Sequence, residues 1–364
     1  MKTVCMTNKC SGCMACIGKC NKNAISIMDD LFAYNAVIDE SKCIICGACE
    51  RVCPNINRIE MSKPLKWHQG WSNKDLRKKS SSGGVASAMI ESFIREGGYV
   101  ASCLFKEGEF IFDITNDIEE AKKFAGSKYV KSNPMDIYNK IYIKLKEEKK
   151  VLFIGLPCQV AAIKNFVKTE ANLYTVDLIC HGSPSPQIFN KFLEEHGCNI
   201  KKLNDVKFRS KNQYGVIVDG KKIASDRVID DYMLTFLNCV DFTENCYSCQ
   251  YASFERISDV TLGDSWGTEL KDEEKNGVSL ILVQNDKGND LITKARLKLN
   301  DVDIDKAIVN NNQLKEPSFI HPKRDKFINY IRQGKSFRYA TFAAVHQSVI
   351  KQRIKFLLIK VGII

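Results

Sequence analysis

Eight cysteines near the start of the chain follow a repeated spacing that is typical of iron-sulfur ligands. The first run is Cys-x2-Cys-x2-Cys-x3-Cys from Cys10 to Cys20, and the second repeats it from Cys43 to Cys53, where Pro54 follows. Three closely spaced thiolates wrap one face of a 4Fe-4S cubane, and the fourth reaches the neighbouring cluster. This spacing predicts two 4Fe-4S clusters, one held by Cys10, Cys13, Cys16 and Cys53 and the other by Cys20, Cys43, Cys46 and Cys49.

Two other interpretations of these cysteines carry less weight. A disulfide framework suits a small secreted protein, but this chain has 364 residues and its N-terminus lacks a charged, apolar and small-residue leader. Paired Cys-x2-Cys units are also zinc signatures, but zinc sites usually need two such pairs with a longer gap between them. Two triplets, each followed by x3-Cys, favour iron-sulfur clusters and hence a ferredoxin-like N-terminal domain.

The composition indicates an ordinary globular protein of more than one domain. Hydrophobic residues make up 44% and charged residues 27% of the 364 positions, which allows two or three domains with their own cores. Sixteen cysteines kept reduced for metal ligation imply a reducing compartment, so we expect a cytoplasmic location. Every apolar run is far shorter than the ~20 residues that cross a bilayer, so we expect no transmembrane segment.

The net charge of +11 is compatible with several partners. An acidic electron carrier such as a ferredoxin or flavodoxin, or a redox partner subunit, suits a protein that begins with two clusters, because opposite fields speed transient docking. An anionic substrate or a membrane surface would suit the same charge. Nucleic acid is not favoured, because the basic residues are spread along the chain and no recognition module accompanies them.

The order of the expected elements indicates an α/β core behind the N-terminal domain. Apolar stretches on either side of an Asp-Asp turn predict a small hairpin over 24–38, between the two cysteine runs. Further along, apolar runs of strand length alternate with helical patterns, which implies βαβ units. We therefore expect a mixed, largely parallel sheet with flanking helices, preceded by a small α+β domain. The expected strands and helices of the core include strands over 99–104, 151–154, 173–179 and 278–284, and helices over 85–96, 134–149 and 160–167.

Two glycine-containing turns could hold a phosphate. The run Ser80 to Gly84 precedes a helix that we expect to have a Ser N-cap and to stop at Gly97, and a helix N-terminus offers unpaired N–H groups to an anion. A second turn, Ala125 to Tyr129, places Lys128 beside Gly126 and Ser127. Each signal is weak alone, because most such turns only cap a helix and most lysines are solvated.

Four more cysteines have chemically suggestive positions. Cys158 and Cys180 follow expected strands, where α/β sheets collect their ligands, and Cys246 and Cys249 form a Cys-x2-Cys pair. Local spacing does not tell whether the four converge. Two ordinary buried cysteines and half of a zinc site remain the alternative.

The order of several short motifs resembles a known flavoprotein family. These motifs are Ser82-Gly83-Gly84, Ala125 to Tyr129, Leu156 to Ala161, Cys180-His181-Gly182, Cys246-x2-Cys249 and Gly263-Asp264-Ser265-Trp266-Gly267. The chain is similar to the beta subunits of hydrogenases and dehydrogenases that use the deazaflavin coenzyme factor 420, over about residues 75–335. Family members include reductases of chlorophyll intermediates, so the resemblance does not fix the substrate.

The resemblance implies cofactors and their contacts. It implies a flavin, FAD or FMN, beside a third 4Fe-4S cluster. The cysteines that match the family's cluster motif are Cys158, Cys180, Cys246 and Cys249, and the positions that match its flavin-contacting regions are Ser82, Gly83, Gly84, Gly126, Ser127, Lys128 and Tyr129.

We therefore expect an iron-sulfur flavoprotein oxidoreductase that passes electrons from ferredoxin-type carriers through clusters and a flavin to an organic two-electron acceptor. The alternative is a non-catalytic electron-transfer adapter of a larger redox complex. The catalytic acid stays open, with Lys128, Tyr129 and His181 as candidates and a structural role favoured for His181.

The expected organisation has five parts. They are a ferredoxin-like domain over 1–57, a connector over 58–79, a flavin-binding half over 80–165, a second half over 166–338 that completes the third cluster site, and a basic amphipathic tail helix over 339–364. Such a helix lies on a membrane surface, docks on a partner or packs on the core, and the sequence leaves these alternatives open.

Overall fold

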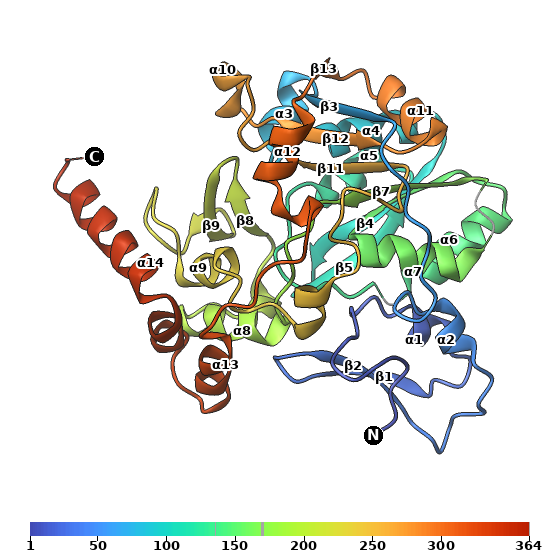
Figure 1. Cartoon of the computed structure of the whole chain (residues 1–364), viewed down its shortest axis with the longest axis horizontal. Coiled ribbons are helices and arrows are strands. Elements are labelled where there is room, and N and C mark those ends of the chain that lie inside the picture. Colours follow the sequence, from blue (N-terminus) through green and yellow to red (C-terminus); the bar gives the residue numbers. More distant parts are fainter. Residues whose placement is uncertain (135, 169–170, 364) are drawn as a thin grey trace.

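An eight-stranded sheet forms the centre of the fold in the computed structural model, which describes residues 1–134, 136–168 and 171–363 (Figure 1). Met135, Thr169, Glu170 and Ile364 lie outside the described residues. The strand order is β13-β3-β12-β11-β7-β6-β4-β5. The strands are β3 (Lys66–Trp71), β4 (Tyr99–Lys106), β5 (Glu109–Thr115), β6 (Val151–Gly155), β7 (Leu173–Leu178), β11 (Val260–Asp264), β12 (Ser279–Val283) and β13 (Lys298–Asn300).

The direction of the strands agrees with the expected α/β class. Strands β4, β6, β7 and β11 pair in parallel in the middle of the sheet, whereas β5, β12, β3 and β13 join through antiparallel pairs toward the two edges. Strand β6 is buried along its whole length, which explains its continuous apolar run.

Helices cover both faces of this sheet. Helices α4 (Val85–Arg95), α5 (Ile118–Ala121) and α11 (Asp286–Lys294) pack on one face, where Met89 and Leu291 meet Leu152 and Ile154 of β6. Helices α6 (Ile137–Lys146) and α7 (Pro157–Val167) cover the other face, where Ile163 lies in one cluster with Phe153. Successive side chains of β6 point to opposite faces of the sheet, so this strand contributes to the hydrophobic core on both faces.

The N-terminal domain repeats its local structure as it repeats its cysteines. The hairpin of β1 (Ile25–Asp29) and β2 (Tyr34–Ile38) confirms the expected one, and it separates α1 (Ala15–Lys19) from α2 (Ala48–Val52). Each helix follows a left-handed residue, Met14 or Gly47, and each is capped by the last cysteine of its run. The domain packs below helices α6 and α7 in Figure 1.

The C-terminal elements form a second core beside the sheet. An aromatic cluster that includes Phe189, Phe208 and Tyr232 joins a small three-stranded sheet to the surrounding helices. The strands and α-helices from residue 186 onward that lie outside the main sheet, apart from α11, are β8 (Val206–Ser210), β9 (Gln213–Val218), β10 (Lys221–Lys222), α8 (Pro186–Glu195), α9 (Asp231–Leu237), α10 (Lys271–Glu274), α12 (Ile304–Asn310), α13 (Arg324–Arg332) and α14 (Phe337–Lys360).

Two local expectations require correction. The stretch 58–79, which we expected to be a connector, supplies helix α3 (Lys74–Lys79) and strand β3, which pairs with β12 and β13 inside the sheet. Helix α4 stops at Gly97 as expected, but its N-cap is Gly84, with φ +81° and no side-chain cap, instead of a serine. A Cβ at Gly84 would lie 2.4 Å from Ser72 Oγ, so the turn needs a glycine.

A buried ion pair ties the segment after Cys249 to the sheet. Arg256 Nη2 lies 2.9 Å from Asp177 Oδ1 of β7, with 2% and 0% of the two side chains exposed. The same guanidinium donates to the carbonyls of Tyr251, Ser253 and Leu178. It therefore joins the Cys-x2-Cys segment to the strand that leads to Cys180.

We predict that Arg256→Met lowers the free energy of unfolding by about 3–5 kcal/mol, because it leaves the Asp177 carboxylate buried without a counter-charge. Anaerobic urea titration followed by circular dichroism measures the change. Lys123→Met is the control, because Lys123 pairs with Glu120 on the surface and its loss is expected to cost less than about 1 kcal/mol. Equal losses in the two variants would contradict the structural role of Arg256.

Candidate metal centres and cofactor site

The first predicted set of cysteines surrounds one small cavity. Its wall contains all four expected thiols, Cys10, Cys13, Cys16 and Cys53, together with Val4 and Ala36. Burial raises the pKa of Cys13 and of Cys16. Thiols with raised pKa values stay protonated at neutral pH unless a cation stabilises the thiolate, and iron ions supply that charge. The residues therefore fit a cluster at this position.

A fifth thiol in the same cavity was missed by the sequence interpretation. Cys5 lines the wall and lies within hydrogen-bonding reach of the Cys10 and Cys53 thiols, and Asn55 Nδ2 donates to its sulfur at 3.7 Å. Its segment is fixed by the Val4 N–H, which donates to Ala36 O of β2. Cys5 stands outside the repeated spacing, and no local pattern could have identified it.

The second predicted set lies nearer to the surface. Cys20 and Cys49 are neighbours, and Cys49 also lies near Cys16 of the first set. The backbone N–H of Ala24 donates to Cys20 Sγ at 3.4 Å, a contact typical of thiolate ligands. Cys46 is exposed and Cys43 partly exposed, on the segment that leads into α2.

The third predicted set comes together from three separate segments. Cys158 lies in the first turn of α7, Cys180 follows β7, and Cys246 and Cys249 lie in and just after a short 3-10 helix (Glu244–Ser248). The pKa of Cys180 is raised to about 12 by burial and by the neighbouring thiols of Cys246 and Cys249. The pKa of Cys158 is raised by burial and by the neighbouring thiol of Cys249. Cys158, Cys180 and Cys249 keep partial solvent exposure, so they border a space instead of filling it.

The described residues contain no group of three His, Cys, Asp or Glu side chains that converge on a single metal ion. A cubane needs no such convergence, because each of its thiolates binds a different iron.

The first and third sets are adjacent. The Cys158 thiol lies close enough to Cys13 for the two to influence each other's charge. Tyr138 and Tyr251 lie at this junction, where the Tyr138 hydroxyl donates to Cys13 O at 2.7 Å. Gln250 Nε2 donates to Pro54 O at 2.9 Å, which joins the Cys-x2-Cys segment to the end of the second cysteine run.

A buried lysine stands between the two sets. Lys131 is 6% exposed, and its Nζ donates to Ser11 O at 2.9 Å and lies 5.2 Å from the centre of the Tyr34 ring. Its positive charge acts on Cys13, Cys158 and Cys180. The sequence interpretation singled out Lys128, three residues earlier, and missed Lys131.

The two turns that could hold a phosphate lie side by side. The Ser127 N–H donates to Ser81 Oγ at 3.0 Å. Behind them, Arg209 of β8 donates to Ser81 O and forms a two-pronged pair with Asp264 at the end of β11, with both contacts at 2.8 Å. Lys211 Nζ donates to the carbonyls of Arg77, Ser80 and Ser82, and burial lowers its pKa to about 8.

The individual flavin-contact candidates differ in their surroundings. Ser82 and Gly83 bond to Val278 O and Ser279 Oγ, so their polar groups are largely used inside the protein. Lys128 Nζ donates to Phe124 O and Ala125 O and thereby caps the preceding helical turn. By contrast, a Cβ at Gly126 would meet nothing within 4 Å, so Gly126 borders open space.

Of the two other acid candidates, Tyr129 packs its ring on Phe236, with centres 4.6 Å apart. His181 keeps an exposed surface, but desolvation by the surrounding protein lowers its pKa, and the charges of Asp264 and Arg209 also reach it. His181 directly follows Cys180, so it links the third cysteine set to the Arg209–Asp264 pair.

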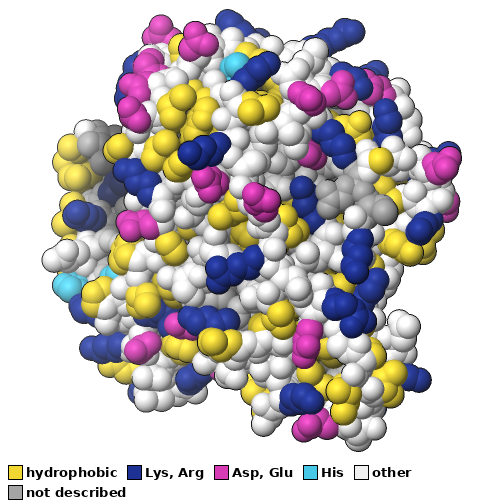
Figure 2. Space-filling model, turned by 45° about the vertical axis from the view of Figure 1, so that its right-hand side comes forward, with side chains coloured by type: hydrophobic (Ala, Val, Ile, Leu, Met, Phe, Trp, Pro, Cys, Tyr) yellow, Lys and Arg dark blue, Asp and Glu magenta, His cyan; other side chains and the backbone are white. Residues whose placement is uncertain are grey.

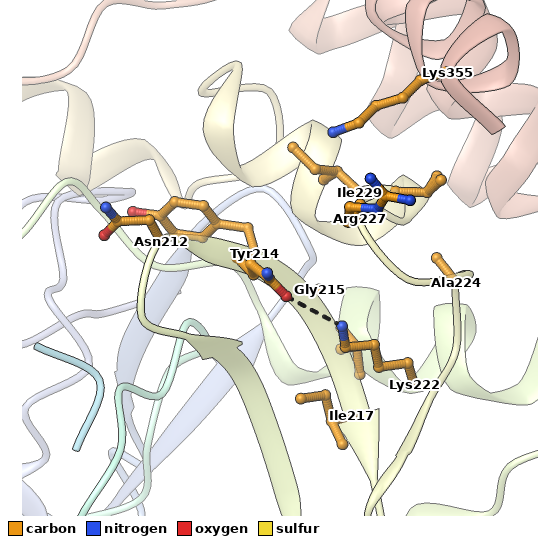
Figure 3. Close-up of a pocket in the computed structure, with 12 residues that line it drawn as sticks. Asn212, Tyr214, Gly215, Ile217, Lys222, Ala224, Arg227, Ile229 and Lys355 are labelled. Carbon is orange, nitrogen blue, oxygen red and sulfur yellow. Dashed lines mark hydrogen bonds between the residues drawn. The ribbon is translucent and has the colours of Figure 1, made fainter. Parts of the chain in front are cut away.

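A larger cavity of about 250 Å³ lies between the β9–β10 hairpin and helix α14 (Figure 3). Figure 3 shows Lys222, Arg227 and Lys355 around it, and Tyr214 at its far side. No cysteine lines this cavity. It touches the Arg209 region through Tyr214, whose hydroxyl accepts from Arg209 Nη1 at 3.2 Å.

Comparison with known proteins assigns both parts of the chain. Residues 148–305 match the family described as the C terminus of the beta subunit in coenzyme F420 hydrogenase/dehydrogenase, and residues 9–56 match the 4Fe-4S dicluster domain. The chain therefore combines a segment similar to the C terminus of that beta subunit with a 4Fe-4S dicluster domain. It is an iron-sulfur electron-transfer protein with an N-terminal dicluster domain.

Two individual relatives match parts of the chain. An uncharacterized protein of Methanocaldococcus jannaschii is 24% identical over 338 residues, which cover 79% of this chain and 87% of that protein. An uncharacterized ferredoxin-like protein of Haemophilus influenzae is 37% identical over 70 residues, which cover 18% of this chain and 73% of that protein.

A solved structure shares the fold. A chain of the F420-reducing NiFe hydrogenase complex from Methanosarcina barkeri superposes with a TM-score of 0.52 at 16% identity, over 76% of this chain and 96% of that chain. This likeness confirms the expected fold class, and the matches over residues 148–305 and 9–56 confirm the expected resemblance.

We predict that Cys246→Ser lowers the iron content by about four atoms per chain and leaves the N-terminal clusters in place, because it removes one thiol of the third set. Iron and acid-labile sulfide are counted after anaerobic purification. Cys198→Ser is the matched control, because Cys198 lies outside all three sets and its thiol contacts His196 O. Unchanged iron in Cys246→Ser would show that the third set holds no cluster.

Proposed function

We propose that the protein is an iron-sulfur flavoprotein oxidoreductase in which the three cysteine sets hold three 4Fe-4S clusters in a row. The observation that carries this proposal is the position of Cys158, whose thiol neighbours Cys249 and Cys180 of its own set and Cys13 of the first. Cys49 of the second set lies near Cys16 of the first, and Cys13 of the first set lies near Cys158 of the third. The first set therefore stands between the second and the third. Bound 4Fe-4S clusters each carry one electron at a time.

The exposed end of this row is the proposed point of electron entry. Cys46 is exposed, and Ile44 and Ile45 between Cys43 and Cys46 are 62% and 81% exposed. A small apolar surface next to a cluster favours brief docking of a redox carrier. The net charge of +11 favours an acidic carrier. Figure 2 shows Lys and Arg on one face among Asp, Glu and hydrophobic side chains, so the positive charge there is not gathered in a single stripe.

The row ends at the proposed flavin site. The adjoining turns at Ser81 and Ser127, the start of α4 and the open space at Gly126 fit a phosphate-bearing cofactor. Arg209 and Asp264 hold the turns in place, and Arg209 Nε is a buried donor without a partner among the described residues. A bound flavin supplies the pairing of two single electrons that an organic acceptor requires.

His181 is the proposed proton donor at this site. His181 directly follows Cys180, within reach of the charges of Asp264 and Arg209. Desolvation lowers its pKa, so near neutral pH the ring is uncharged and donates through its one N–H. The side chains of Lys128 and Tyr129 are held by Phe124 O and by the Phe236 ring, so we assign them positioning roles. The acceptor itself is an organic molecule of a class that the site does not identify.

The alternative is a non-catalytic adapter that passes electrons to a partner enzyme. The solved structure with the shared fold comes from a hydrogenase complex, which favours a role within a larger assembly. The adapter would use the same cysteine sets, and it would need no flavin.

Counting cofactors distinguishes the two functions. The proposed oxidoreductase, purified anaerobically, is expected to contain about twelve irons and one flavin per chain, and reduced ferredoxin is expected to bleach the flavin absorbance. About eight irons without flavin would favour the adapter. Zinc in place of iron would overturn both.

We predict that Lys131→Met lowers the midpoint potentials of two clusters, because reduction adds negative charge next to a lost buried cation. The expected shift is on the order of tens of millivolts. Redox titration followed by electron paramagnetic resonance measures it, with iron content as the check on assembly. Lys140→Met is the control, because Lys140 pairs with Asp113 at the surface. Unchanged midpoint potentials in Lys131→Met would show that the charge of Lys131 does not influence the clusters.

A further inference from the structure

Helix α14 changes character at a kink. Its first half packs against α9 and α13, with Phe337, Ala340, Thr341 and Ala344 buried. Val345 has the non-helical angles φ −127° and ψ 44°. Beyond the kink, the helix runs outward to one side of the molecule, where the C-terminus lies in Figure 1.

The second half keeps one side toward the body. Val349 is 4% exposed, and Gln352 Oε1 accepts from the Ile229 N–H at 3.0 Å. Lys355 points toward the cavity of Figure 3, next to Ile229 and Arg227. These contacts fix the rotation of the helix about its axis, so the opposite side faces away from the protein.

That opposite side is apolar. Ile350, Ile354, Leu357 and Val361 follow the i, i+4, i+7, i+11 spacing of a single helix face, and they are 42%, 52%, 58% and 67% exposed. Phe356, on another side of the helix, and Ile363, after the last helical residue, are 40% and 66% exposed. Figure 2 shows hydrophobic side chains beside Lys and Arg at its left edge, the side on which α14 lies in Figure 1.

Basic residues border this face on both sides. With 3.6 residues per turn, Lys351 lies along one border and Arg353 and Lys360 along the other. No Asp or Glu occurs in the sequence after Asp325. Long basic side chains can keep their charged ends in the lipid headgroup region while the neighbouring apolar side chains enter the acyl boundary.

The charge pattern selects the occupant of this surface. A second copy of the helix would bring like charges together along both borders, which opposes pairing. An anionic lipid surface complements both the cations and the apolar stripe. None of the described helices is long and apolar enough to cross a bilayer, so the helix would lie in the plane of the surface.

We propose that the segment from Ile350 to Ile363, which comprises the second half of α14 and the residues directly after it, is an in-plane membrane anchor for anionic phospholipid. This proposal is independent of the flavin and of the third cluster, because the anchor shares no residue with the cysteine sets or with the two glycine-containing turns.

Vesicle sedimentation with the full-length, cluster-loaded protein tests the anchor. The protein is expected to bind vesicles that contain about one-third phosphatidylglycerol in phosphatidylcholine. Its affinity for pure phosphatidylcholine vesicles is expected to be lower by a factor of at least about ten. High salt is expected to weaken binding to the anionic vesicles. Equal binding to the two kinds of vesicle, or no binding to either, would overturn the proposal.

Two variants separate the apolar and the basic contributions. Ile350→Ser, Ile354→Ser and Leu357→Ser together remove the stripe, and Lys351→Gln, Arg353→Gln and Lys360→Gln together remove three bordering charges. The affinity of each triple variant for anionic vesicles is expected to fall by a factor of at least about ten. Iron content and circular dichroism equal to those of the unchanged protein show that the fold is kept.

A matched charge control uses the opposite side of the molecule. Lys146→Gln, Lys149→Gln and Lys150→Gln remove the same charge from exposed positions in and after α6, and binding is expected to stay within about twofold. A similar loss in this control would show that general charge, not the helix, determines binding. A dimer in light scattering that the serine variant converts to a monomer would assign the face to a second copy instead.

Discussion

The packing of the N-terminal cysteine domain against the first turn of α7 is the contact on which the remaining arrangement depends. It brings Cys13 next to Cys158, and three hydrogen bonds from different parts of the core hold it: Tyr138 to Cys13 O, Lys131 to Ser11 O, and Gln250 to Pro54 O. Because the donors come from α6, from the segment before it and from the segment after Cys249, the domain cannot rotate without losing at least one of them. Cysteine sets that lie far apart in the chain thus become neighbours in the fold.

The central sheet explains why distant residues meet beyond this contact. Strands β6, β7 and β11 are adjacent and parallel, so their carboxyl ends reach the same edge of the sheet. Cys158, Cys180 and Asp264 stand at these three ends, which places the third cysteine set beside the Arg209–Asp264 pair. In α/β sheets such an edge is the usual place for ligands.

Buried cations accompany this part of the structure. Lys131 is 6% exposed and Arg209 is 6% exposed, and Arg256 pairs with Asp177 next to the Cys-x2-Cys segment. Burying a cation is costly unless negative charge accompanies it. Arg209 and Arg256 are paired with Asp264 and Asp177, whereas Lys131 donates to the Ser11 carbonyl beside the proposed thiolates. A cluster with four thiolates would supply negative charge next to Lys131, so the electrostatics of the protein and of the proposed cluster are complementary.

The sequence by itself determined the features that depend on local spacing. The two cysteine runs, the hairpin between them, the strands around Val151 and Leu173 and the family motifs could all be predicted, because ligand spacing, turn chemistry and apolar periodicity act over a few residues. Only the tertiary structure decided the rest. It placed β3 inside the sheet, set Gly84 instead of a serine as the cap of α4, added Cys5 to the first cavity, and put Lys131 between two cysteine sets. These features arise from packing between segments that lie far apart in the chain, so no local pattern carries a signal for them.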